Sequence, residues 1–101
     1  MKDYIIEMIN GQKKSKSHLK AQSLSSLRLR LIKEGVLKRQ EMVIIFTTTA
    51  EKVTPSTPFK KTGVIWLDNY NDQYFWMDNN GQTKNVSAKT GAVSAFKVGG
   101  Y

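Results

Sequence analysis

Residues 23–35 read SLSSLRLRLIKEG and carry the strongest secondary-structure signal in the chain. Ser23 is a good N-cap residue, and Gly35 can adopt the left-handed conformation that ends a helix. Between them, three leucines recur at i, i+3 and i+7, which places them on one helical face: Leu24, Leu27 and Leu31. We therefore predict a helix over residues 23–34, and three side chains lie opposite the leucines: Ser26, Arg30 and Lys33.

The same stretch also contains a conflicting pattern. Residues 27–31 alternate strictly between leucine and arginine, which is typical of a strand. Leu29 also falls outside the leucine face. We keep the helix because its two ends are marked and because leucine and arginine are good helix formers. Leu29 then has no role unless it packs against the preceding basic segment or a partner.

Length and composition exclude several classes of protein. The 101 residues are enough for one domain with a modest core. The chain has no cysteine and a single histidine, His18, which excludes disulfides, cysteine-based zinc sites and sites with several histidines. The longest apolar run, Met42 to Phe46, is too short to span a membrane, and the charged first residues do not resemble a signal peptide. We expect a cytoplasmic protein without a metal or cofactor.

Charge is the most informative property of the composition. The net charge is +8, and it is unevenly distributed. Residues 1–40 hold ten basic and three acidic side chains, net +7, whereas residues 41–101 hold six and five, net +1. A basic half of this kind indicates a polyanionic partner. The alternative is a charged surface that serves only solubility.

The rest of the chain divides into a helical and a β part. We predict a short helix over residues 3–10, capped by Asp3, and another from Ser17 to Gln22. The β-branched and aromatic content then predicts strands, with turns at Asn79-Asn80-Gly81 and Lys89-Thr90-Gly91. These strands are Met42–Thr49, Gly63–Asp68, Gln73–Asp78, a polar and therefore edge-like Gln82–Ala88, and Ala92–Val98. The prediction is a single α+β domain over residues 1–101, with short N-terminal helices (1–40) before a small antiparallel sheet (41–101).

This order of elements resembles a winged helix-turn-helix protein over about residues 3–68. The resemblance is carried by residues 4–9 (YIIEMI), by residues 17–19 (SHL), and above all by Leu24 and residues 31–39 (LIKEGVLKR). Little room is left between Leu19 and Leu24 for the usual second helix and turn, and no glycine marks that turn. The resemblance implies that helix 23–34 enters the major groove of double-stranded DNA and that loop 51–62 is the tip of the wing.

On this interpretation the protein is a transcriptional or nucleoid-type regulator. Serines at the start of the helix suit phosphate or base edges, arginine suits guanine, and lysine suits phosphate. The predicted DNA-contacting residues are Lys13, Lys14, Lys16, Lys20, Ser25, Ser26, Arg28, Arg30, Lys33, Lys38, Arg39, Lys60 and Lys61. No catalytic residue is predicted.

Other functions stay open at this stage. RNA is a second polyanion that the basic half would suit, and the edge-like strands would suit a homodimer. The apolar strand from Met42 or the aromatic strands would suit a protein partner, as in an inhibitor or accessory subunit. Stacking of unpaired bases is a further use of the aromatic side chains, which are Trp66, Tyr70, Tyr74, Phe75 and Trp76. A small ribonuclease is the third alternative, with His18 as its only candidate for acid–base catalysis.

Overall fold

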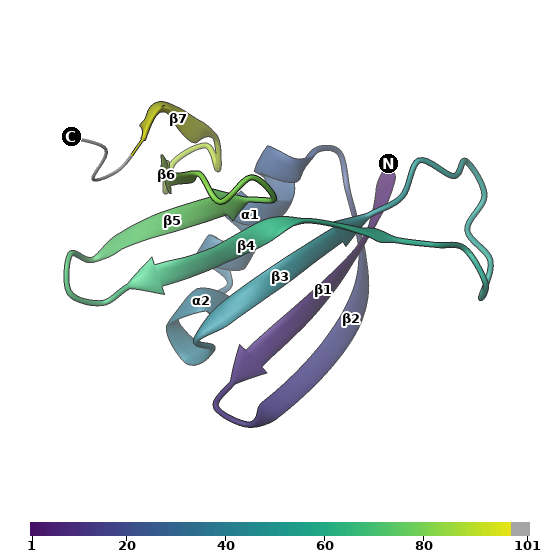
Figure 1. Cartoon of the computed structure of the whole chain (residues 1–101), viewed down its shortest axis with the longest axis horizontal. Coiled ribbons are helices and arrows are strands. Elements are labelled where there is room, and N and C mark those ends of the chain that lie inside the picture. The colour runs from purple at the N-terminus through teal and green to yellow at the C-terminus, as the bar shows by residue number, and fades with distance from the viewer. Residues whose placement is uncertain (98–101) are drawn as a thin grey trace.

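The computed structural model describes residues 1–97, which form one antiparallel sheet backed by two helices (Figure 1). The strands are β1 (Lys2–Asn10), β2 (Lys13–Ala21), β3 (Met42–Thr47), β4 (Lys60–Asp68), β5 (Gln73–Asp78), β6 (Thr83–Val86) and β7 (Val93–Lys97). Their order in the sheet is β2-β1-β3-β4-β5-β6-β7. Two helices follow β2 in the chain and pack on one face: α1 (Leu24–Lys33) and α2 (Val36–Arg39).

The two helices predicted before residue 23 are wrong. Residues 2–10 and 13–21 form a β-hairpin of two nine-residue strands, β1 and β2, paired from Lys2 with Ala21 to Asn10 with Lys13. Gly11, with a φ of 65°, sits in the two-residue loop of this hairpin. The isoleucines of β1 point to both faces of the sheet, because successive side chains alternate: Ile6 packs in the core, while Ile5 and Ile9 lie on the other face. An all-round apolar pattern of this kind imitates a short helix.

The winged-helix-like α+β arrangement is therefore also wrong. In place of N-terminal helices and a small sheet, the molecule is built on a seven-stranded sheet that includes the N-terminal residues. The hairpin predicted as a wing does exist, since β3 pairs with β4. This hairpin lies in the middle of the sheet, however, with β1 beside β3 and β5 beside β4.

The helix predicted over residues 23–34 is confirmed as α1. The backbone N–H of Ser26 donates to the Ser23 hydroxyl at 3.1 Å, as expected for an N-cap. Gly35 has a φ of 73° and ends α1 in the left-handed conformation. Within the described residues neither helix is long and apolar enough to cross a membrane.

The core fills the space between α1, α2 and one face of the sheet. Its fully buried side chains come from the leucine face and from alternate positions of the central strands: Leu27, Leu31, Val43, Ile45 and Ile65. Trp76 on β5 joins them by lying across Gly63 on β4, where any Cβ would collide with the indole ring. Alternation along each strand thus selects which residues meet the helices.

The strands predicted after residue 41 are present with adjusted ends. The third predicted strand, β5, matches its expected bounds, whereas β4 begins at Lys60 and β3 ends at Thr47. The polar strand β6 is not an edge, because β7 pairs with it. Val98, the last residue of the final predicted strand, lies outside the described residues.

Candidate nucleic-acid interface

The two faces of the sheet differ in what covers them. One face carries α1 and α2, and the other, here called the open face, has no helix over it in the described chain (Figure 1). Strand pairing assigns alternate residues to each face, and Tyr4, Ile6, Val43, Ile45 and Ile65 all point toward the helices. Their sequence neighbours on the same strands therefore belong to the open face.

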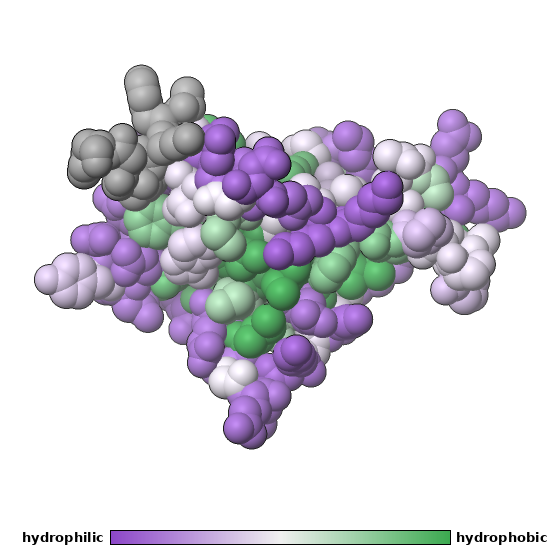
Figure 2. All heavy atoms as spheres, in the orientation of Figure 1, coloured by the Kyte–Doolittle hydropathy of each residue, from purple (hydrophilic) through white to green (hydrophobic). Residues whose placement is uncertain are grey.

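The open face has an apolar centre. Figure 2 shows this centre surrounded by polar side chains. Strand pairing supplies its residues, which are Ile5, Ile9, Met42, Ile44, Phe46, Val64, Trp66, Phe75 and Met77. Val64 and Phe75 are only 6% exposed, while the others remain partly exposed. An uncovered apolar surface is typical of a binding face.

A line of three lysines and one histidine borders this centre along β2. Lys14, Lys16, His18 and Lys20 pair with Ile9, Glu7, Ile5 and Asp3 of β1, so all four point to the open face. We call these four residues the basic edge. All are exposed, and consecutive members are about 6.6 Å apart along the strand, since they are two residues apart and each residue rises about 3.3 Å.

Two carboxylates of β1 partly neutralise the basic edge. Lys16 Nζ lies 3.8 Å from Glu7, and Asp3 lies 3.0 Å from His18 Nε2 and 4.0 Å from Lys20 Nζ. The lysine side chains in these pairs are about two-thirds exposed, at 68% and 66%, so water weakens the attraction strongly. Such exposed lysines can leave their carboxylates for a phosphate at small cost. The sequence prediction grouped Lys13 with Lys14, Lys16 and Lys20, and strand pairing places only the last three on the open face.

Aromatic side chains of the open face stand in line with cations. Phe46 on β3 pairs with Lys61 on β4 and, on its other side, with Ile5, which pairs with His18. Trp66 on β4 packs against Phe75, with ring centroids 6.0 Å apart and planes tilted by 42°. Phe59, just before β4, meets the His18 ring edge-on at 5.9 Å.

Arg28 is not available to a ligand. It is 5% exposed, its Nη1 donates to the carbonyl of Gly91 at 3.1 Å, and its guanidinium lies 4.4 Å from the centre of the Trp76 ring. Burial lowers the pKa of Arg28 to about 10, although the nearby Tyr4 opposes this shift. The sheet encloses that side of α1, so the side chain that was predicted to read DNA is buried in this structure.

The β6–β7 turn covers another side of α1. A Cβ on Gly91, whose φ is 76°, would collide with the carbonyl oxygen of Ser25 and approach Leu29. This contact explains Leu29, which packs beneath the turn rather than facing solvent. Ser25 is accordingly only partly exposed and poorly placed to touch DNA.

The remaining predicted residues of the helical part form a narrow exposed stripe. Ser26, Arg30 and Lys33 lie on the outer surface of α1, and Arg30 donates to Glu34 at 3.1 Å and to the carbonyl of Lys20 at 3.4 Å. On α2, Lys38 is exposed and Arg39 donates to the Glu34 carbonyl at 3.1 Å.

These residues do not share a surface with the basic edge. The structure places the helical cations on the covered side of the sheet and the basic edge on the open side. Lys13 and Lys60 point to the helix side of their strands, whereas Lys61 points to the open face. The thirteen predicted residues thus separate into two groups.

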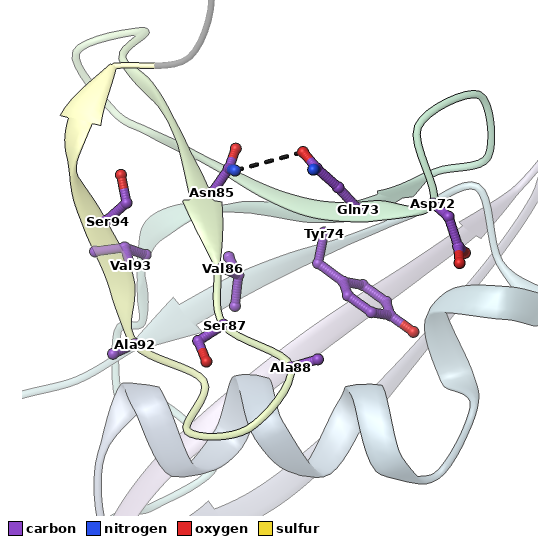
Figure 3. Close-up of a pocket in the computed structure, with 10 residues that line it drawn as sticks. All are labelled: Asp72, Gln73, Tyr74, Asn85, Val86, Ser87, Ala88, Ala92, Val93 and Ser94. Atoms are coloured by element: carbon purple, nitrogen blue, oxygen red, sulfur yellow. Dashed lines mark hydrogen bonds between the residues drawn. The ribbon is translucent and has the colours of Figure 1, made fainter.

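A hollow of about 450 Å³ lies at the β5–β6–β7 end of the sheet (Figure 3). Its lining is mostly neutral: Asp72, Gln73, Tyr74, Asn85, Val86, Ser87, Ala88, Ala92, Val93 and Ser94. Figure 3 shows Tyr74 and Val86 on one side of the strands, and Gln73 and Asn85, joined by a 3.4 Å hydrogen bond, on the other. Neither this lining nor any cluster within residues 1–97 brings together three acidic, histidine or cysteine side chains that could hold a metal.

The sequence prediction placed Phe46 and Met42 in a strand that would suit a protein partner, and not among the nucleic-acid contacts. Both were assigned to a well-buried strand, yet they are partly exposed on the open face. The available signal was the alternation along this strand, which places Met42, Ile44 and Phe46 on one face and Val43 and Ile45 on the other. Both sets are apolar, so the pattern does not show which face is covered. Only the sheet shows that helices cover one face and not the other.

Comparison with protein families, characterised proteins and solved structures gave no match to this chain. We therefore infer the function from the geometry of the open face.

Proposed function

We propose that this protein binds nucleic acid through the open face of its sheet. The single observation that supports this proposal best is the basic edge, which places three exposed lysines and His18 on one side of β2. Contacts between lysine and phosphate supply most of the affinity of sequence-independent nucleic-acid binding. The even spacing of the basic edge suits a ligand whose charges repeat along a line.

The proposal differs from the sequence prediction in the surface that it uses. Helix α1 loses Arg28 and Ser25 as contacts, so its outer stripe retains few of the groups that groove recognition needs. Binding to double-stranded DNA stays a prediction, which the duplex in the assay below addresses. A role in regulation also stays a prediction. Lysine on an edge strand also discourages pairing with another sheet, a role that would need no ligand.

The test is a salt titration of binding by fluorescence anisotropy, with labelled single-stranded DNA, duplex DNA and RNA in parallel. Three lysine contacts to a single strand predict a slope of about −2 for log K against log salt. The variant Lys14→Gln/Lys16→Gln/Lys20→Gln should lose most of this slope and bind at least tenfold more weakly near 50 mM salt.

The matched control is Lys33→Gln/Lys38→Gln/Lys89→Gln, which removes the same charge from exposed positions away from the basic edge. This control should bind like the parent. If it loses affinity while the β2 variant does not, the helical surface is the interface and the proposal is wrong. Equal losses in both variants would indicate a net-charge effect without a site.

A further inference from the structure

The open face also indicates which form of nucleic acid it suits. We infer that the ligand is single-stranded, with unpaired bases stacked on Phe46 and Trp66 while the basic edge and Lys61 contact phosphates. This inference rests on the proposed function and adds the class of ligand.

Phe46 and Trp66 are the partly exposed aromatic residues of the open face on the adjacent strands β3 and β4. Val64 pairs with Ile44, and continuing this register places Trp66 beside Met42. Phe46 and Trp66 are therefore about 13 Å apart along the strands, four residues at about 3.3 Å each. This separation exceeds the contact distance of two stacked bases, so each ring would receive a different, non-adjacent base.

The two rings are supported from the sides. Phe75 is 6% exposed and packs against Trp66, which limits the movement of the indole. Ile5 and Ile44 flank Phe46 on the open face. A ring that is held at its edges while its outer surface stays partly exposed is well suited to stacking, since little side-chain entropy remains to be lost.

A lysine stands at one end of each row that contains one of these rings. The row of Phe46 runs from His18 through Ile5 and Phe46 to Lys61. The row that reaches Trp66 starts at Lys14 and passes Ile9 and Met42. Phosphates beside β2 would thus leave bases free to extend over the apolar centre, which is the arrangement that single-strand binding requires.

This arrangement disfavours a duplex and a protein partner as occupants of the open face. Bases within a duplex present their edges and not their faces, so stacking on a ring needs unpaired bases. A protein partner would also bury the apolar centre. The cations aligned with both aromatic positions instead favour a polyanion with flat apolar groups.

The test uses the intrinsic fluorescence of the intact protein, which has two tryptophans. Trp76 is 4% exposed in the core, whereas Trp66 lies on the open face. A thymidine oligonucleotide of about 12 nucleotides should quench Trp66 emission in proportion to the bound fraction. A duplex of the same length should cause much less quenching, and the remaining emission of Trp66→Leu should not respond.

Two variants and a control give the binding energies. Phe46→Leu and Trp66→Leu keep apolar side chains and should each weaken single-strand binding about tenfold while the salt slope stays unchanged. Tyr70→Leu removes an aromatic ring that is 95% exposed at the β4–β5 turn, and should bind like the parent.

The possible failures are distinguishable. Unchanged affinity of both leucine variants, together with a normal salt slope and no quenching, would overturn the stacking inference and leave the proposed function standing. Absence of salt-dependent binding to any oligonucleotide would overturn both. If the leucine variants instead abolish self-association seen by sedimentation at high salt, the open face is an interface between two copies and the inference is wrong.

Discussion

At the scale of single residues, Arg28 is the side chain whose role differs most from its expected one. It fills space between α1, Trp76 and the Gly91 carbonyl, and its Nε has no hydrogen-bond partner. The aromatic ring and one carbonyl offset only part of the cost of burying the charge. Arg28 is therefore a packing residue with an electrostatic penalty.

This role predicts different outcomes for two substitutions. Arg28→Ala should lower the free energy of unfolding by about 2–4 kcal/mol, because it leaves a cavity and an unpaired carbonyl. Arg28→Met keeps most of the volume without a charge, and should change stability by less than about 1.5 kcal/mol. Urea denaturation measures both values. Methionine costing as much as alanine would contradict a packing role.

The Met variant also tests the sequence prediction for Arg28. Since the guanidinium is buried, Arg28→Met should bind oligonucleotides with the affinity and salt slope of the parent. Arg28 lies at the border of the leucine face, so helical spacing allows it to be either buried or exposed. No pattern in residues 23–35 distinguishes these two possibilities. The difference arises from Trp76 and Gly91, which are far away in sequence.

At the scale of elements, the local sequence pattern was insufficient to identify β1 and β2 as strands. The helix α1 was predictable because its caps and its leucine spacing agree. The isoleucines of β1 fit a helix and a strand equally well, since this strand carries apolar side chains on both of its faces. The Asn10-Gly11 pair and the alternation of lysine in β2 were the hairpin signals, and they agree with β-pairing over nine residues on each strand.

Amide hydrogen exchange should distinguish these two strands. β1 lies between β2 and β3, so its amides should be protected throughout. β2 pairs only with β1, so its amides should alternate between slow and fast exchange with a period of two residues. Exchange measured by NMR provides the data. Uniform protection of β2 would contradict an unpaired edge, and a helical period would contradict the strand.

At the scale of the whole molecule, the sheet encloses its helix from two sides. Arg30 of α1 meets the end of β2 at Lys20, and the β6–β7 turn meets Ser25 and Leu29. Contacts between residues so distant in sequence close the core. They also leave the opposite face of the sheet without a helix over it within the described residues.

The closing contact at Gly91 can be tested against a glycine of similar conformation. Gly91→Ala should cost about 2–4 kcal/mol, because it adds a collision with the Ser25 carbonyl to the strain of a positive φ. Gly81→Ala, at a φ of 81° with no atom within 4 Å of the added Cβ, should cost only about 1 kcal/mol. Thermal unfolding measures both. Equal costs would mean that the turn does not pack on α1.

The sequence by itself determined the helix α1, the order of strands after residue 41 and the concentration of positive charge in residues 1–40. These are local properties, set by spacing, capping and turn residues within a few positions. The tertiary structure alone decided that residues 2–21 form a hairpin, that Arg28 is buried and that Phe46, Trp66 and the basic edge share one face. Each of these depends on which strands lie side by side, and an inner strand is recognised only by its neighbours.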